Sequence, residues 1–571
     1  MENGFVKYLN KLHNFNAQNQ NAYAESNVTD AYFEKVMVHS RLVDYLQDCL
    51  SGNEAPHILI LTGHAGDGKT SIMYEVLEKL GAQFDPKADT KEITLPTGTD
   101  CLCVKDFSEL SDNRKNEILS QAVSYPKQGK FVFMIANTGP LINTFTSLVS
   151  EDDREELQLN LIDAIDASSG EITEVHGWPI RVINVATVDN TYFAPQFLDK
   201  ITDPSLWSVC EDCPKKAYCH ILRNCKLIQE NHQQVERFLR EHYTWLAEYN
   251  NRLTIRSITE QLAFMMTGGN DCEDVVEREP DAFLFSNLFF GYYGTVPLRR
   301  AQKLLSIHEA CECNYDAKKL RSDEELLIHR NYRSLFTEDV ASIIESAETK
   351  NWAQQGWTEF LHRTYFFLNC VADKEQKKRD LEDVFSEQFG RYLQLTRGEM
   401  VPNNLERQLV VQALCVLYTG TPILEEDKDI PITLSRESGL LQNVQMVIGK
   451  LRREDIEVIA EKTTDNVIGG GEEKYRLYLV VKGERLRTQL TLPLMDYFND
   501  LRQGIIPTNV DPQLSHGVEN IKAQIAQIVQ EDMSDKDDPD VYTISMNVLR
   551  NSGNRIYRVR INRKDHTMGE S

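Results

Sequence analysis

One run of eight residues constrains the fold of this chain more than any other feature. Its sequence is Gly63-His64-Ala65-Gly66-Asp67-Gly68-Lys69-Thr70, which matches the pattern G-x-x-x-x-G-K-[ST]. In this pattern the glycines let backbone N–H groups turn toward an anion. A short, unalternating apolar run over 57–62 precedes the motif, as a buried parallel strand would, and a helical pattern over 71–82 follows it. This order predicts an α/β domain.

The same motif predicts a nucleotide site, because phosphate groups fit a loop of inward-facing N–H groups at a helix N-terminus. Lys69 would reach the β- and γ-phosphates of ATP, and the hydroxyl of Thr70 would bind Mg²⁺. ATP and Mg²⁺ are therefore the expected ligands. The residues expected to bind them are Gly63, His64, Ala65, Gly66, Asp67, Gly68, Lys69, Thr70 and Ser71.

Hydrolysis of ATP requires an acidic residue that holds Mg²⁺ and a polar group that orients the attacking water. Asp106 follows the apolar run 101–104, and Glu109 lies three residues further on, so both are candidate catalytic residues. Two alternatives stay open. Asp106 could instead cap the helix or turn that follows it, and Asp189, after the apolar run 181–188, could hold the ion.

Asn137 follows the next apolar run, 131–136, and is a further candidate catalytic residue. On a strand beside the Mg²⁺-binding one, its amide would orient the attacking water or contact the γ-phosphate. The alternative is a turn-forming role before Thr138-Gly139-Pro140. Its place in the chain, after the candidate Mg²⁺-binding strand, supports the functional role.

Four of the twelve cysteines lie within sixteen residues, at positions Cys210, Cys213, Cys219 and Cys225. Four thiolates complete a tetrahedral shell around Zn²⁺ or hold a [4Fe–4S] cluster, so this set predicts a metal site of either kind. His220 could replace one cysteine, and four reduced thiols in a helical region are the alternative. The basic residues that flank the set suit docking onto a partner, contact with nucleic acid or simple solvation; they are Lys215, Lys216, Arg223 and Lys226.

The order of glycine loop, acidic strand, Asn-tipped strand and arginine-bearing helix resembles an AAA+ type P-loop NTPase over about residues 50–300. The resemblance implies that Arg256, near the start of the helical pattern 252–266, leans over the γ-phosphate from a lid, with Thr254 as the N-cap. An ordinary surface arginine is the alternative.

With the cysteine set, the layout is similar to the DptF (DndF) family of DNA phosphorothioation-dependent restriction systems. That resemblance implies an ATPase subunit of a bacterial defence complex, with DptG and DptH as partners and DNA reached through the complex. The sequence departs from the AAA+ pattern at Asp106, because Lys105 interrupts the apolar run and the two acids are not adjacent. A nucleotide-gated scaffold with little turnover and a signalling NTPase therefore stay open, and a homo-oligomer fits each of these functions.

The whole chain predicts an α/β fold with a P-loop NTPase core and a parallel sheet, a helical lid, a helical middle region and a mixed α+β C-terminal domain. In the last of these, the segments 476–481, 489–494, 541–548 and 557–563 alternate as strands do. The expected boundaries are 1–48 for an N-terminal helical segment, 49–204 for the core, 205–228 for the cysteine insert, 229–330 for the lid, 331–428 for the helical region and 429–571 for the C-terminal domain.

The charge of the chain limits how it can meet a polyanion. Asp and Glu number 87 against 62 Lys and Arg in 571 residues, which gives a net charge of −25 and disfavours coating of nucleic acid. Local contact with nucleic acid stays open, since Arg558 and Arg560 would share one strand face.

The sequence contains no apolar run of about 18 residues, so no membrane-spanning helix is expected. The N-terminus lacks a signal-peptide pattern, and the cysteines then suit a cytoplasmic location with reduced thiols.

Overall fold

The computed structural model spans the chain and describes most of it. The described residues are 2–13, 30–40, 42–51, 54–82, 88–167, 170–188, 190–275, 280–368, 384–423, 428–434, 444–463, 474–505, 510–534, 541–550, 553–562, 564 and 567–570. Asp189, the alternative Mg²⁺ ligand, lies outside them. The described residues form two compact units, one made of those up to position 368 and one of those from position 384 onward.

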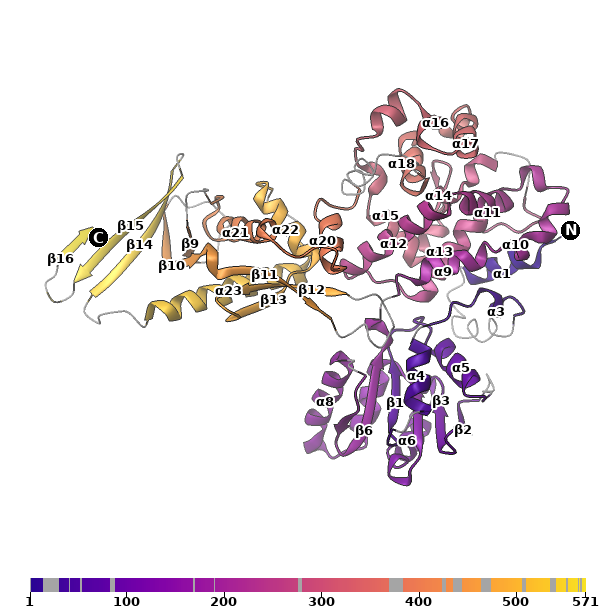
Figure 1. Cartoon of the computed structure of the whole chain (residues 1–571), viewed down its shortest axis with the longest axis horizontal. Coiled ribbons are helices and arrows are strands. Elements are labelled where there is room, and N and C mark those ends of the chain that lie inside the picture. Colours follow the sequence, from indigo (N-terminus) through magenta and orange to yellow (C-terminus); the bar gives the residue numbers. More distant parts are fainter. Residues whose placement is uncertain are drawn as a thin grey trace. The chain divides into compact units, whose positions relative to one another are not determined.

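A six-stranded sheet organises the N-terminal half of the first unit (Figure 1). Its strands, in spatial order, are β2 (Thr90–Thr94), β3 (Asp100–Val104), β4 (Phe131–Ile135), β1 (Ile58–Thr62), β6 (Trp178–Asn184) and β5 (Thr173–Val175). The inner four strands are parallel, as expected, and their apolar runs are buried on both faces.

The two edge strands are antiparallel, so the prediction of a parallel sheet was wrong at its edges. The reason is the length of the connections. His176 and Gly177 alone join β5 to β6, both with positive φ, and a two-residue turn of this kind can only reverse the chain. A short turn over 95–99 likewise joins β2 to β3.

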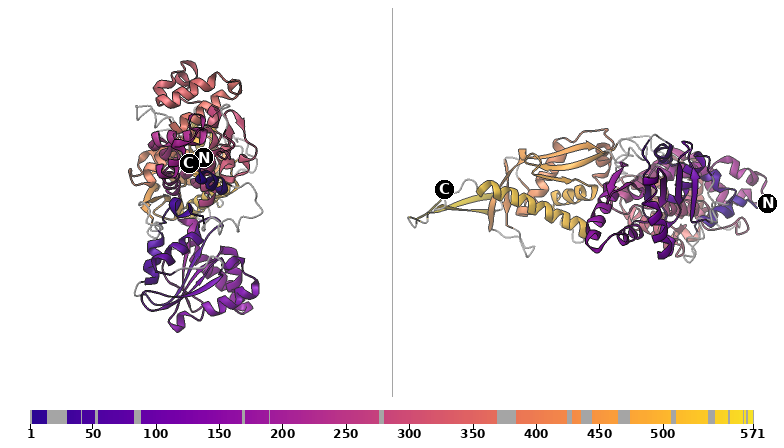
Figure 2. Two further views of the ribbon diagram at one scale, coloured as in Figure 1. Left: turned by 90° about the vertical axis from the view of Figure 1, so that its right-hand side faces the viewer. Right: turned by 90° about the horizontal axis from the view of Figure 1, so that it is seen from below.

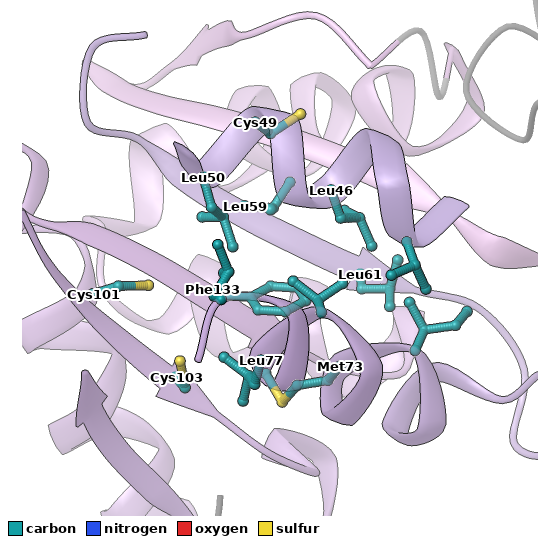
Figure 3. Close-up of a cluster of buried hydrophobic side chains, with 14 of the residues drawn as sticks. Leu46, Cys49, Leu50, Leu59, Leu61, Met73, Leu77, Cys101, Cys103 and Phe133 are labelled. Atoms are coloured by element: carbon teal, nitrogen blue, oxygen red, sulfur yellow. The ribbon is translucent and has the colours of Figure 1, made fainter. Parts of the chain in front are cut away.

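Helices cover both faces of this sheet. On one face, α4 (Leu42–Ser51) and α5 (Lys69–Lys79) pack against Leu59, Leu61 and Phe133. Figure 3 shows the ring of Phe133 among the leucines of α4, β1 and α5. On the other face, α6 (Asp112–Ala122), α7 (Thr138–Ser147) and α8 (Arg154–Ala167) pack against the alternate strand residues, because successive side chains of a strand point to opposite faces.

The carboxyl ends of the four parallel strands meet at one edge of the sheet, where ligands of open α/β sheets bind. The glycine loop follows β1, Asp106 follows β3, and Asn137 follows β4. Because β4 lies between β3 and β1, the sheet places the segment of Asn137 beside that of Asp106, as the chain order predicted.

The rest of the first unit is mainly helical, with a small sheet of β7 (Tyr292–Tyr293) and β8 (Val296–Pro297). Its central helix α13 (Ile255–Thr267) contacts α1 (Gly4–Leu12), α9 (Phe193–Ile201), α11 (His220–Glu230), α14 (Phe285–Leu288) and α15 (Leu305–Glu312). Further helices include α12 (His232–Glu248), α17 (Glu338–Glu348) and α18 (Trp357–Leu368). The buried residues of α13 lie around most of its circumference, which is why so many helices can pack on it.

The second unit combines helices with two antiparallel sheets (Figure 2). One sheet holds β9 (Asp429–Thr433), β10 (Val444–Arg452), β14 (Val541–Arg550), β15 (Gly553–Asn562) and β16 (Thr567–Glu570), and the other holds β11 (Ile456–Lys462), β12 (Tyr475–Val481) and β13 (Leu486–Gln489). The helices are α20 (Phe389–Thr396), α21 (Asn404–Thr419), α22 (Leu492–Arg502) and α23 (Pro512–Ser534).

The prediction of a strand over 489–494 was wrong. Strand β13 ends at Gln489, and α22 begins at Leu492 with Thr491 as the N-cap and Pro493 in the first turn, where its missing N–H costs nothing.

Among the helices of the described residues, none combines the length and the apolar character that a bilayer-spanning helix needs.

The core packing in Figure 3 makes a quantitative prediction. Phe133→Ala removes a ring that is 0% exposed, and we expect a loss of about 3–5 kcal/mol in the free energy of unfolding. Hydrogen exchange of β1 and β4 peptides in increasing urea measures this loss. Leu159→Ala on α8, where the side chain is 57% exposed, is the control and should change it by less than about 0.5 kcal/mol. Equal effects of the two substitutions would contradict the packing.

Candidate functional site

The glycine loop joins β1 to α5 in a conformation that needs its glycines. Gly63, Gly66 and Gly68 have φ of 140°, 94° and 79°, a region that other L-residues rarely adopt. At Gly66 space matters as well, because a Cβ would lie 3.0 Å from the Thr254 Oγ1 and 3.2 Å from the Arg256 Cβ. The loop therefore lies directly under the first residues of α13.

Lys69 begins α5 and turns its side chain back into the loop. It is only 8% exposed, and its Nζ donates hydrogen bonds to the carbonyl oxygens of Gly63 (3.1 Å) and His64 (2.7 Å). Burial lowers the pKa of Lys69, nearby Asp67 and Asp106 raise it, and Arg256 lowers it. The loop thus encloses a cation that both neighbouring carboxylates favour.

Thr70 and Asp106, which come from different elements, meet at the sheet edge. The Thr70 Oγ1 donates a hydrogen bond of 3.2 Å to the Asp106 Oδ1. Asp106 has a left-handed backbone with φ 48°, and its side chain does not cap the short helix 107–109 that follows. The carboxylate is instead directed to Thr70, with the Lys105 Nζ 3.6 Å from its other oxygen.

Asn137 lies at the start of α7 with extended backbone angles, and its side chain does not cap that helix. Its backbone N–H donates to the Ser108 Oγ (2.6 Å), which ties the end of β4 to the segment after Asp106. Beside it, the Thr138 Oγ1 is 3.1 Å from the Thr62 Oγ1 at the end of β1. Glu109 belongs to the same segment as Asp106 but is exposed.

A buried ion pair that the sequence did not predict connects the loop to the helical region. Asp67 is 0% exposed, and the Arg252 Nη1 lies 2.9 Å from its Oδ1. The other oxygen of Asp67 accepts the backbone N–H of His64 (3.0 Å). Arg252 also donates to the carbonyl oxygens of Val185 (3.2 Å) and Val188 (3.4 Å), beyond β6. One guanidinium therefore joins three segments.

Arg256, the predicted lid arginine, lies at the N-terminus of α13 against the loop. Its backbone N–H donates to the Gly66 carbonyl oxygen (3.1 Å), and Thr254 caps the helix by accepting the N–H of Ser257 (3.2 Å). One turn further along α13, burial raises the pKa of Glu260 to about 7, although Arg256 lowers it. The start of α13 is thus fixed to the loop by main-chain and side-chain contacts together.

The predicted cysteine set is only partly brought together. Cys210, Cys213 and Cys219 line one small cavity, whereas Cys225 is 1% exposed and does not line it. The fourth thiol at the cavity belongs to Cys272, which the sequence did not single out. His220 stacks on the Phe283 ring, and burial lowers its pKa to about 4, so its surroundings are those of a core residue.

No protein-family model, no curated protein and no solved structure matches this chain. The function of the chain is therefore inferred from the geometry of the loop, the sheet edge and α13.

The ion pair predicts a stability change. Arg252→Ala leaves the carboxylate of Asp67 buried without its counter-charge, and we expect a loss of about 3 kcal/mol in the free energy of unfolding of the first unit. Hydrogen exchange in urea measures it. Adding Asp67→Asn to that variant should recover part of the loss. Arg240→Ala removes a 44% exposed arginine paired with Glu236 and should cost less than about 1 kcal/mol. No recovery in the double variant would contradict the pairing.

Glu260 predicts a pH dependence. Its folded-state pKa of about 7 lies above its ordinary value of 4.5, so the folded state binds more protons between these two values. Stability should therefore fall as pH rises from about 4.5 to about 7 and stay level above that range. Glu260→Gln should abolish this contribution. The thermal unfolding midpoints of the wild type and of Glu260→Gln, measured between about pH 4.5 and 7, test this prediction. If the two midpoints change with pH in the same way, Glu260 does not have a raised pKa in the folded state.

Proposed function

We propose that this chain binds ATP with Mg²⁺ in a P-loop formed by residues 63–70, at the carboxyl edge of the sheet, and hydrolyses it. The observation that carries the proposal is the hydrogen bond between Thr70 and Asp106. The hydroxyl after the loop lysine and an acid at the end of a second strand form a pair of oxygen ligands, as phosphoryl transfer on Mg²⁺ requires.

The residues present fit the ion. Hydroxyl and carboxylate oxygens are the hard ligands that Mg²⁺ prefers, and Thr70 and Asp106 would hold it. When bound, Mg²⁺ neutralises charge on the phosphates. The chain supplies the rest of the charge compensation, since Lys69 lies at the loop and Arg256 contributes positive potential beside it.

The lid contacts favour coupling between nucleotide and the helical region. Arg252 and the N-terminus of α13 contact the loop directly, through Asp67 and the carbonyl of Gly66. A nucleotide that changed the loop would therefore act on α13, around which the helices of the first unit pack. This arrangement supports a nucleotide-gated scaffold as the second candidate, with slow turnover as its signature.

A role in a phosphorothioation-dependent DNA restriction complex rests on the sequence resemblance. The proposal is that partner subunits of the DptG and DptH type use the ATPase and that DNA contact occurs within that complex. Purification from the native host, followed by identification of the bound proteins, tests this part separately from the nucleotide chemistry.

Two substitutions test the ATP site. Lys69→Ala removes the loop cation, and we expect ATP affinity to fall about 10- to 100-fold in equilibrium binding. Asp106→Ala should lower the rate of phosphate release by about 100-fold or more while ATP still binds. A wild-type protein that binds ATP without turnover would favour the scaffold over the ATPase.

Matched controls lie close in the chain. Lys79→Ala changes a lysine of the same helix α5, whose Nζ pairs with Asp44 near the surface. Asp112→Ala removes a carboxylate at the start of α6 that is 97% exposed. Both should leave binding and turnover unchanged. If Lys79→Ala weakened ATP binding as much as Lys69→Ala, the loop assignment would be wrong.

A further inference from the structure

Four cysteine side chains line one small cavity in the helical part of the first unit. Cys210, Cys213 and Cys219 lie between α10 (Pro204–Trp207) and α11, and Cys272 lies in the segment that follows α13. The cavity has a volume of about 20 Å³, enough for about one water-sized particle. Its other lining is mainly apolar, with Trp207 among the side chains.

We propose that these four thiols bind a single Zn²⁺ ion as thiolates, with Cys272 in place of Cys225 as the fourth ligand. Binding releases four protons to solvent and leaves a complex of net charge −2. Lys215 and Lys216 line the same cavity and supply positive charge next to it. The inference is independent of the ATP site.

Polar contacts already hold the cysteine segments around the cavity. The Asn3 Nδ2 donates to the Cys210 Sγ (3.3 Å), and Asn3 is only 4% exposed. Such an N–H to sulfur contact favours a thiolate and orients it. The Lys215 Nζ donates to the carbonyl oxygens of Cys272 (2.9 Å) and Val275 (2.9 Å). These hydrogen bonds hold the segment of Cys272 against the segment that carries Cys213.

Cys219 has a second kind of support. It is the N-cap residue of α11, where unpaired N–H groups favour negative charge. The backbone N–H groups of Leu222 and Ile221, in the first turn of that helix, interact with the sulfur of Cys219.

Cys225 is excluded by the geometry of α11. It follows Cys219 by six residues, and at about 100° per residue it lies on a different side of the helix. Its Sγ instead faces the Thr202 carbonyl oxygen at 4.0 Å, and the residue is 1% exposed. The thiol of Cys225 is thus packed in the core and does not line the cavity.

As it stands, the cavity has room for about one water-sized particle, and a single Zn²⁺ is the smaller of the two groups that four thiolates bind. Among the described residues, no three His, Cys, Asp or Glu side chains as they stand form a metal-ligand set. The proposal therefore requires the thiols to turn inward by rotation about χ1 between staggered positions.

Metal analysis of the full chain, purified after growth with added zinc, tests the proposal. We expect about one zinc per chain and an X-ray absorption spectrum with four sulfur neighbours at about 2.3 Å. Cys272→Ser should reduce the zinc content to less than about one tenth, and Cys272→His should restore it, because imidazole is also a zinc ligand. Cys225→Ser is the matched control and should keep the zinc.

Several results would overturn the site. They are zinc retained in Cys272→Ser, zinc lost from Cys225→Ser, iron with sulfide in place of zinc, or a metal-free chain whose thiols are free or joined in disulfides. If Cys272→Ser does not fold, alkylation of the wild-type thiols with and without a chelator tests the ligand set. A chelator should expose Cys210, Cys213, Cys219 and Cys272 to the reagent together while Cys225 stays protected, and the opposite pattern refutes the ligand set.

Discussion

The buried ion pair between Asp67 and Arg252 is the contact on which the arrangement of the candidate site depends. A carboxylate that is 0% exposed cannot keep its charge at low cost without a cation beside it, so the glycine loop and the start of α13 have to stay together. The same guanidinium holds the segment after β6 through two carbonyl oxygens. The α/β sheet and the helices around α13 are thereby joined at the loop, and the first unit behaves as one unit there.

Cations gather at the loop although the chain as a whole is acidic. The net charge is −25, yet Lys69, Arg252, Arg256 and Lys105 lie at the carboxyl edge of the sheet, near the carboxylates of Asp67, Asp106 and Glu260. Attraction of a polyphosphate depends on this local potential, because charges more than about 10 Å away are largely screened at 0.1 M salt. An acidic protein and a phosphate site are therefore compatible.

The sequence predicted the site where local patterns carry the information. Apolar runs marked the four parallel strands, the glycines marked the loop, and the polar residues after two runs marked Asp106 and Asn137. The topology of parallel strands then brings those ends to one edge. The antiparallel edge strands, the start of α22 and the partner of Asp67 were missed. Short turns, a single N-cap position and a distant arginine leave weak local signals. The charge of Asp67 inside the glycine loop was the local signal that a cation should lie beside the loop.

Cys272 and Arg252 show most clearly where sequence reasoning stops. Spacing along the chain suggested Cys225, and the helical lid suggested Arg256, since both are prominent in their local patterns. The folded chain brings Cys272 to the cavity that Cys210, Cys213 and Cys219 line, and it brings Arg252 as well as Arg256 to the glycine loop. The physical reason is that strand, loop and helix formation depend on neighbours within a few residues, and these the amino-acid sequence displays. Which thiol or guanidinium meets a given buried group depends on the path of the backbone over the whole unit, and only the tertiary structure decides that.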